Sequence, residues 1–305
     1  MTEPIQSSGE NENSATAKQR HPTSVYRKLR RKLSKTKLRV PHIWFRHRGF
    51  RPSDVFFASY PRSGSTWARF TLFEIFTGRQ SGFEAVNAGL AGVGAHFSGL
   101  ACLPGDGRLI GTHEQFRKEY KRALYLVRDC RDVALSEFAY TRALEFFHGD
   151  LDQFLRTFHC KKISAFGPWQ RHVTSWLDSP TAVAGNLLVV RYEDLRQNPV
   201  RGFSEITRFL GVNSPVERIQ RAVANNSLDR MKEKERAEPQ RASVKDRFVR
   251  AGSIQGWRSK LTPPQVQFIE QYAGSVLQRL GYPVSGATTE ADLAVTPVFH
   301  GTSSN

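Results

Sequence analysis

The sequence predicts an α/β fold in which a central parallel sheet is covered by helices on both faces. Short, continuous apolar runs alternate along the chain with longer segments of helical periodicity, as expected for strands that are buried on both sides. The chain has 305 residues, of which 39% are hydrophobic and 21 are Phe, so it is long enough for one large core. The polar motifs follow the predicted strands, where parallel sheets bind ligands. We therefore expect a single three-layer domain.

The first predicted strand covers residues 54–59, an apolar run that leads into a loop rich in Gly and Ser. An apolar-periodic segment begins directly after this loop and predicts a helix over residues 65–77. A second, short strand is predicted over residues 109–112 and ends at His113. Residues 123–127 form a third apolar run, so the chain repeats the strand-to-helix pattern.

The second half of the chain continues this pattern with one more strand and several helices. The fourth strand is predicted over residues 186–190. Helices are expected over residues 131–147, 199–210, 215–225 and 262–280. The last of these has Thr262 as its N-cap, two prolines in its first turn and Gly281 after its end. These signals make its boundaries the best defined in the chain.

The predicted domain covers residues 52–284, and the segments around it lack its periodicity. Residues 1–17 are polar and predict a disordered tail, and residues 285–305 predict a flexible C-terminal tail. Residues 18–51 contain 13 Lys or Arg and no Asp or Glu, which defines a basic N-terminal arm. Within the domain, residues 230–256 are highly charged and poor in apolar anchors, so we expect a long surface loop or lid there.

The net charge of +17 is concentrated at the start of the chain, where residues 1–51 carry +10. The body is therefore only moderately basic, as expected of a protein that holds a multiply charged anion. No apolar run approaches the length of a membrane span, and the first residues lack the pattern of a secretion signal. The three cysteines, Cys102, Cys130 and Cys160, are scattered, which fits a reducing compartment and predicts a cytoplasmic protein.

The most informative motif is the loop between the first strand and the first helix, Tyr60-Pro61-Arg62-Ser63-Gly64-Ser65-Thr66-Trp67. The free N–H groups of the helix start face a common point, together with hydroxyls and the cation of Arg62. Such a site suits a phosphate or a sulfate ester. It is not a Walker A loop, because it has one Gly and lacks the Gly-Lys-Ser/Thr end. The alternative is a plain strand-to-helix turn that is capped by Ser65.

A second motif follows the third strand. Arg128 leaves the strand end, and Ser136 lies on the helix after it, so the two side chains are placed to clamp a second phosphate. The alternative is an internal salt-bridge cluster in which two acids pair with two cations: Asp129, Asp132, Arg128 and Arg131. Taken alone, the motif does not decide between them.

Two weaker elements accompany these motifs. His113 ends a strand near the predicted anion site and is placed to take a proton from an acceptor hydroxyl, although a single His is more often only a satisfied polar residue. Residues 247–258 mix cations and glycines with aromatic anchors, which suits a segment that closes over phosphates. An ordinary basic surface loop is the alternative for this segment.

In this order, the four elements resemble the cytosolic-type sulfotransferase family, whose members use 3′-phosphoadenosine 5′-phosphosulfate (PAPS). The resemblance covers roughly residues 54–283. It implies a fold like that of the P-loop nucleotide kinases. It also implies transfer of a sulfonate group from PAPS to a hydroxyl acceptor by in-line displacement, with PAP as the product. No metal is expected in this reaction.

The resemblance also implies roles for individual residues. The loop is similar to the family's 5′-phosphosulfate loop, with these donor contacts: Arg62, Ser63, Gly64, Ser65, Thr66 and Trp67. Arg128 and Ser136 resemble the clamp on the 3′-phosphate, and His113 matches the general base, with Arg62 as a second catalytic residue. Further nucleotide contacts are implied for Tyr192, Leu228, Arg250, Ala251 and Gly252. Of these residues, Trp67 and Leu228 are expected against the adenine.

The chain departs from the family at three positions where the family carries a lysine. Arg62 stands in the loop, where it keeps the charge but cannot donate a proton at neutral pH. Gly111 precedes Thr112-His113 in place of a Lys, which removes one cation near the sulfate, and Ala251 replaces a Lys in the closing segment. Donor binding is therefore expected to depend on arginines and backbone N–H groups.

Two other functions stay open at this point. A nucleotide kinase would need Mg²⁺, held through a hydroxyl and a strand-end acid such as Asp129. A non-enzymatic protein that binds nucleic acid or a membrane surface would use the basic arm, since clusters of Lys and Arg attract phosphates and anionic lipid. A solvated charge run is the default for such an arm.

The acceptor is expected beside His113, and the sequence leaves a small molecule, a lipid and a carbohydrate open. Candidate walls are residues 82–107 and an aromatic cluster, of which at least half is expected in the core: Phe138, Tyr140, Phe146, Phe147 and His148. The basic arm suggests peripheral contact with an anionic membrane, at its inner face. The resemblance also makes a homodimer an expectation.

Overall fold

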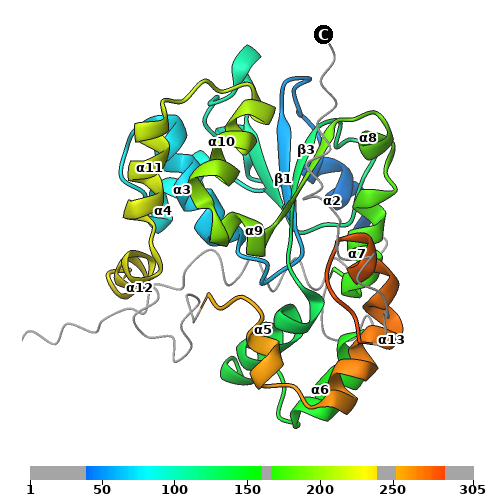
Figure 1. Ribbon diagram of the computed structural model, residues 1–305. Coiled ribbons are helices and arrows are strands. Elements are labelled where there is room, and N and C mark those ends of the chain that lie inside the picture. Colours follow the sequence, from blue (N-terminus) through cyan, green and yellow to red (C-terminus); the bar gives the residue numbers. More distant parts are fainter. Residues whose placement is uncertain (1–38, 160–165, 239–251, 286–305) are drawn as a thin grey trace, which may run out of the picture. The chain divides into compact units, whose positions relative to one another are not determined.

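The computed structural model describes residues 39–159, 166–238 and 252–285 (Figure 1). The chain divides into two compact units between Arg48 and Gly49, near the expected end of the basic arm. In the first unit the described helix is α2 (Arg39–Arg46). All other described elements belong to the second unit. None of the described helices is long and apolar enough to span a bilayer.

The second unit is built on a parallel four-stranded sheet with the order β2-β1-β3-β4 (Figure 1). The strands are β1 (Val55–Ser59), β2 (Leu109–Thr112), β3 (Ala123–Val127) and β4 (Leu187–Arg191), which confirms all four predicted strands. The chain passes from β1 to β2 on one side and then to β3 on the other side. The loops after β1 and β3 therefore diverge at a topological switch point, where open α/β sheets bind their ligands.

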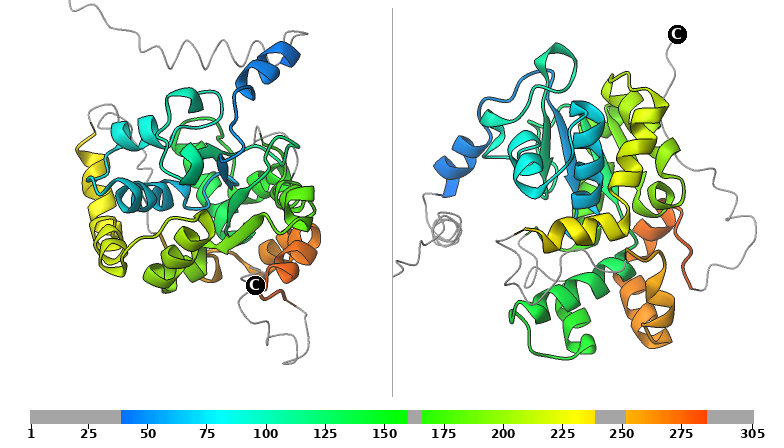
Figure 2. Two further views of the ribbon diagram at one scale, coloured as in Figure 1. Left: turned by 90° about the horizontal axis from the view of Figure 1, so that it is seen from above. Right: turned by 90° about the vertical axis from the view of Figure 1, so that its left-hand side faces the viewer.

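Helices cover both faces of this sheet, as the fold class predicted (Figures 1 and 2). One face packs against α3 (Ser65–Thr77), α4 (Phe83–Gly89), α9 (Tyr192–Gln197), α10 (Pro199–Leu210), α11 (Val216–Asn225) and α12 (Leu228–Arg236). The other packs against α5 (Cys130–Ala143), α6 (Leu151–Phe158), α7 (Trp169–Leu177), α8 (Pro180–Val183) and α13 (Pro263–Arg279). Short 3₁₀ helices are η1 (His96–Ser98), η2 (Pro104–Asp106) and η3 (Gly256–Ser259). Alternate residues of each strand enter the two cores, which explains why the strands are apolar except at their carboxyl ends.

Several helix ends follow their local sequence signals. α10 ends at Gly211, which adopts the left-handed conformation with φ 74°. α13 starts after Thr262, whose N–H donates to the side chain of Gln265 at 3.0 Å. Both boundaries were predicted from these residue types.

Two predictions about helix and loop boundaries were wrong. The helix expected over residues 131–147 ends at Ala143, because Glu145 turns the chain with φ 57°. The loop expected over residues 230–256 begins as helix α12, and Met231 on that helix is only 2% exposed. Residues 239–251 of that loop lie outside the described residues. Lys234 holds α12 in place by donating to Glu74, Ser81 and Asn226. Glu74 and Ser81 are distant in the sequence, so local periodicity does not reveal these contacts.

Candidate active site

A cavity lies at the carboxyl ends of β1 and β3, at the switch point of the sheet. Ten of the residues that line it were singled out from the sequence: Arg62, Gly64, Ser65, Thr66, Trp67, Arg128, Ser136, Tyr192, Leu228 and Gly252. Arg196 and Met231 also line it and were missed. Ser63, which belongs to the same loop, is fully buried. Arg250 and Ala251 lie outside the described residues. The loop after β1 and the segment after β3 thus share one cavity.

The loop after β1 has an unusual backbone. Gly64 adopts φ 91°, and a Cβ atom at this position would lie 2.5 Å from the ring of Tyr192, so only Gly fits. Arg62 also has a positive φ of 69°, which is uncommon for a residue other than Gly and is typical of strained functional loops. α3 begins at Ser65 with Gly64 as its N-cap, and no side chain among the described residues caps it. Ser65 is therefore not the cap, and the first N–H groups of α3 remain available to an anion.

The cavity is positively charged. Three arginines line it, and none of the residues found to line it within the described part of the chain is an acid. Each guanidinium lies over an aromatic ring, at 4.5 Å for Arg62 and Tyr140, 4.7 Å for Arg128 and Tyr192, and 5.1 Å for Arg196 and Trp67. Stacking of this kind fixes the guanidinium planes, and guanidinium groups held in this way suit anions.

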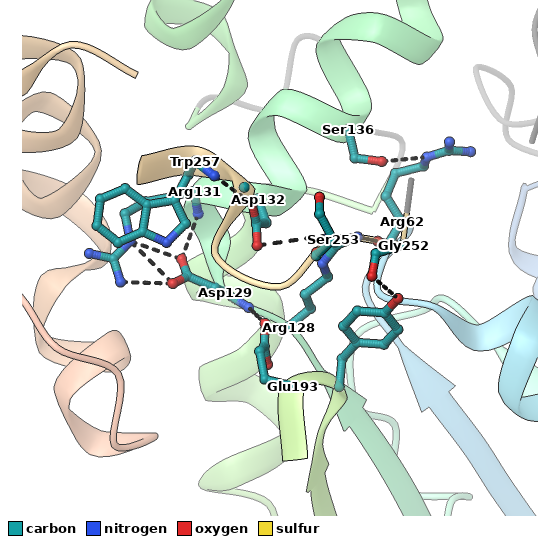
Figure 3. A network of polar contacts seen from close by, with 12 residues as sticks. Arg62, Arg128, Asp129, Arg131, Asp132, Ser136, Glu193, Gly252, Ser253 and Trp257 are labelled. Atoms are coloured by element: carbon teal, nitrogen blue, oxygen red, sulfur yellow. Dashed lines mark hydrogen bonds and ion pairs between the residues drawn. The ribbon is translucent and has the colours of Figure 1, made fainter. Parts of the chain in front are cut away.

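Arg128 joins the cavity to the segment near the C-terminus (Figure 3). Its Nη1 donates to the carbonyl oxygen of Arg62 at 3.2 Å, and its Nη2 donates to that of Ser253 at 2.9 Å. The same Nη2 lies 3.8 Å from a carboxylate oxygen of Asp132. Arg128 therefore belongs both to the cavity wall and to the salt-bridge cluster, and the two interpretations of this motif do not exclude one another.

The rest of that cluster is buried behind the cavity (Figure 3). Arg131 forms ion pairs of 2.7 Å with Asp129 and with Glu270, and its guanidinium lies 3.8 Å from the ring centroid of Trp257. Asp132 accepts a hydrogen bond from the N–H of Trp257 at 2.9 Å, and burial raises the pKa of this Asp. The cluster thus anchors the segment around Trp257 against the start of α5.

The segment before Trp257 also contacts the start of α9. The hydroxyl of Tyr192 donates to the carbonyl oxygen of Gly252 at 3.2 Å. The neighbouring Glu193 accepts hydrogen bonds from the N–H of Asp129 at 3.1 Å and from the hydroxyl of Tyr282 at 2.7 Å. Burial raises the pKa of Glu193. This network positions Tyr192 at the cavity.

His113 lies at the end of β2, beside the strand whose loop forms the cavity, and is not among the residues that line it. Its Nδ1 lies 2.8 Å from the carbonyl oxygen of Ser59. A carbonyl oxygen only accepts, so Nδ1 carries the hydrogen and Nε2 keeps its lone pair. Burial lowers the pKa of His113, which keeps the imidazole neutral at neutral pH. These are the properties of a general base.

His172 supports His113 and was missed in the sequence. Its Nε2 donates to the carbonyl oxygen of His113 at 3.0 Å, and its Nδ1 accepts from the hydroxyl of Tyr125 at 2.9 Å. Burial lowers the pKa of His172 to about 3, so it stays neutral. One His within an apolar helical stripe carries no signal of such a role.

The aromatic cluster proposed as an acceptor wall divides into core and site. Phe138 and Phe147 pack against Phe154 with centroid distances of 5.3 Å and 5.5 Å, so they belong to the core. Phe146 is 77% exposed. Tyr140 lies beneath Arg62 at the cavity. The ring of Phe166 lies 5.8 Å from that of His113 and is a nearer apolar neighbour, which the sequence did not indicate.

Residues 108–281 match the family model of the sulfotransferase domain. The chain is similar to cytosolic sulfotransferase 1 of Danio rerio, with 28% identity over 247 residues that cover 73% of this chain and 82% of the relative. Sulfotransferase 1A1 of Mus musculus is 26% identical over 254 residues, which cover 74% of this chain and 85% of the relative.

Two solved structures share the fold. Mouse sulfotransferase SULT7A1, complexed with PAP, gives a TM-score of 0.58 at 20% identity, over 76% of this chain and 86% of that chain. Retinol dehydratase, in complex with androsterone and PAP, gives a TM-score of 0.61 at 22% identity, over 76% of this chain and 83% of that chain.

Proposed function

Because the chain belongs to the sulfotransferase domain family, we propose that its cavity binds PAPS and that His113 activates the acceptor. The reaction is the transfer of a sulfonate group from PAPS to a hydroxyl, with PAP as the second product. The observation that carries this proposal is the shared cavity, in which Arg62 and Arg128 reach from the ends of two different strands. A doubly phosphorylated nucleotide needs two such anion sites in one cavity.

The residues fit a nucleotide of this kind. The cavity wall contains buried side-chain nitrogens without a hydrogen-bond partner among the described residues. Three of them are in Trp67, Arg128 and Arg196. Buried polar atoms are normally satisfied, so these donors support a polar ligand in the cavity. In this proposal Arg128 and Ser136 bind the 3′-phosphate, and Trp67 and Leu228 lie against the adenine. Tyr192 and Gly252 complete the nucleotide site.

The loop after β1 is proposed to bind the phosphate that leaves. Negative charge builds on this phosphate as its bond to sulfur breaks, so fixed donors that face it lower the barrier. The donors are the N–H groups at the start of α3, the Arg62 guanidinium, and the hydroxyls of Ser65 and Thr66. None of these groups has to exchange a proton, so an Arg in place of a Lys retains the electrostatic role.

His113 is proposed as the general base. The acceptor oxygen forms a bond to sulfur while the bond from sulfur to the phosphate oxygen breaks, and the hydroxyl proton passes to Nε2 of His113. Its Nδ1 stays bonded to Ser59, which fixes the ring. A well-placed base contributes about 10²–10⁴-fold in rate.

The acceptor is proposed to be a hydroxyl-bearing small molecule with an apolar body. Phe166 supplies an apolar surface next to His113. Retinol dehydratase, which shares the fold, is described in complexes with retinol and with androsterone. A screen of hydroxyl compounds with labelled PAPS, read by the mass of the product, tests this class.

The location and assembly of the protein are also proposals. We infer a cytoplasmic protein, because the relative from Danio rerio is a cytosolic sulfotransferase. The basic arm of residues 18–51 is proposed to touch anionic membranes, and a homodimer is proposed from the family resemblance. Sedimentation with vesicles that contain anionic lipid, with and without the arm, tests the first of these, and light scattering tests the second.

The kinase alternative is less well supported. Asp129, the acid proposed to hold Mg²⁺, accepts the N–H and the guanidinium of Arg131 and so caps α5 instead. The deciding experiment supplies labelled PAPS or ATP with and without excess EDTA. Sulfonate transfer that persists in EDTA supports the proposed function. ATP turnover that EDTA abolishes, with none from PAPS, contradicts it.

A further inference from the structure

Arg69 is a partly buried cation outside the cavity described above. It lies on α3, two residues after Trp67, and its Nη2 donates to the carbonyl oxygen of Leu90 at 2.6 Å and to that of Val86 at 3.3 Å. These carbonyls belong to the C-terminal end of α4 and its cap, and they orient the guanidinium. The Nε of Arg69 is buried and has no hydrogen-bond partner in the described parts of the chain.

The charge of Arg69 is not neutralised locally. In residues 39–159, 166–238 and 252–285 no carboxylate forms an ion pair with it. Burial lowers the pKa of Arg69 to about 10, so it still carries its charge at neutral pH. A partly buried cation without a counter-charge is unfavourable, and groups with a shifted pKa of this kind are concentrated where proteins bind ligands.

The position of Arg69 relates it to the reaction centre. A Cβ atom built on Gly111 would lie 3.9 Å from the Nε of Arg69, and Gly111 precedes the proposed base His113 by two residues. Burial lowers the pKa of His113, and the hydrogen bond to Ser59 raises it. The charge of Arg69 is a third influence, which lowers this pKa further. Arg69 therefore presents its free Nε–H next to the residue at which the resembling family carries a lysine.

We propose that Arg69 replaces this missing lysine and donates its Nε–H to a sulfonyl oxygen of bound PAPS. The inference rests on the proposed function. It makes Arg69 a further catalytic residue, because the cation would touch the group in transit and balance its negative charge during transfer. The cation reaches this point from α3 instead of from β2, which leaves the strand position free for Gly.

The test compares the affinities of PAPS and PAP by isothermal titration calorimetry, because only PAPS carries the sulfonate. In Arg69→Met the affinity for PAPS is expected to fall by about tenfold or more, as for a lost charged hydrogen bond, while that for PAP is unchanged. Arg69→Lys should retain most of the preference for PAPS. Arg79→Met removes an exposed cation just beyond the end of α3 and should leave both affinities as in the wild type.

A charge swap provides the sharper test. A Cβ atom at Gly111 would meet only ordinary contacts, from Arg69 and Gly92 at 3.9 Å, so the backbone at this position accepts a side chain. Adding Gly111→Lys to Arg69→Met is expected to restore the preference for PAPS over PAP and to restore turnover. Gly111→Lys in the wild type places two cations together. It should improve neither the preference for PAPS nor the turnover.

The outcomes separate this inference from the proposed function. If wild-type protein binds neither PAPS nor PAP, the proposed function itself fails. If the wild type binds both and Arg69→Met keeps the full preference for PAPS, Arg69 does not touch the sulfonate. An equal loss of both affinities in Arg69→Met, without rescue by Gly111→Lys, would give Arg69 a purely structural role and would also overturn the inference.

Discussion

Nε of Arg62 donates a hydrogen bond to Oγ of Ser136 at 3.2 Å, which joins the loop after β1 to helix α5 after β3 (Figure 3). The two groups proposed to bind different phosphates are therefore in direct contact. A bound nucleotide with phosphates at both ends would engage these groups in place of their contact with one another. The anion sites at the two strand ends form a single unit.

The 3′-phosphate clamp predicts a selective loss of affinity. Arg128→Ala should weaken the binding of PAP by about tenfold or more, because charged hydrogen bonds to the 3′-phosphate are lost. The binding of adenosine 5′-monophosphate, which lacks this phosphate, should weaken much less. Calorimetry with both nucleotides measures this. Ser136→Ala is a second test of the clamp, since it removes a clamp hydroxyl without removing the bonds of Arg128 to Arg62 and Ser253. Equal losses for both nucleotides would remove these residues from the clamp.

The base role of His113 predicts a loss of turnover without a loss of donor binding. His113→Ala should reduce kcat by about 10²–10⁴-fold and leave the affinity for PAP unchanged, because the residue lies outside the nucleotide cavity. An assay with labelled PAPS and a titration with PAP measure the two effects. Turnover within a few-fold of the wild type would refute the assignment.

The pH dependence of the reaction follows from the same residue. Burial lowers the pKa of His113 below the ordinary 6.5, so the reactive neutral form persists to lower pH than for an exposed His. The acid limb of kcat/KM should therefore be centred below pH 6.5. An acid limb centred at or above 6.5 would show that another group controls the rate.

His172 predicts a pH-dependent stability. Its pKa is about 3 in the folded protein and near 6.5 in the unfolded chain, so the unfolded chain binds the extra proton between these values. The contribution of neutral His172 to the free energy of unfolding is complete above pH 6.5. It should fall by about 2 kcal/mol when the pH is lowered to about 5. Urea unfolding of the wild type and of His172→Asn at several pH values measures it. The variant should show a flatter profile, and an equally steep one would assign the effect elsewhere.

Gly64 predicts that a single added methyl group disrupts nucleotide binding. In Gly64→Ala the new Cβ would lie 2.5 Å from the Tyr192 ring, at a φ of 91°, so the loop must move and nucleotide affinity should be lost. Gly78→Ala is the control at the other end of α3, where φ is 68° and no atom lies within 4 Å. It should cost about 1 kcal/mol of stability and leave nucleotide binding intact. Similar effects of both variants on nucleotide binding would contradict the packing argument.

The sequence predicted the elements and motifs whose causes are local. The apolar runs marked all four strands, because strands buried on both faces are built mainly from apolar residues. Gly211 and Thr262 marked helix ends because capping depends on adjacent residues. The loop of Arg62 and the motif of Arg128 were recognised from their spacing, and parallel strands necessarily bring their carboxyl ends to one edge of the sheet.

Tertiary structure alone decided which distant residues meet. His172 supports the backbone of His113 from α7, and Arg69 brings a cation from α3 to Gly111 on β2. α12 formed where a loop was expected, because Lys234 is bonded to residues of another helix and its connecting segment. Burial and pairing of polar groups depend on the packed neighbours, which the order of residues in the chain does not specify. A sequence shows that a residue can carry charge, and packing decides which partner that charge faces.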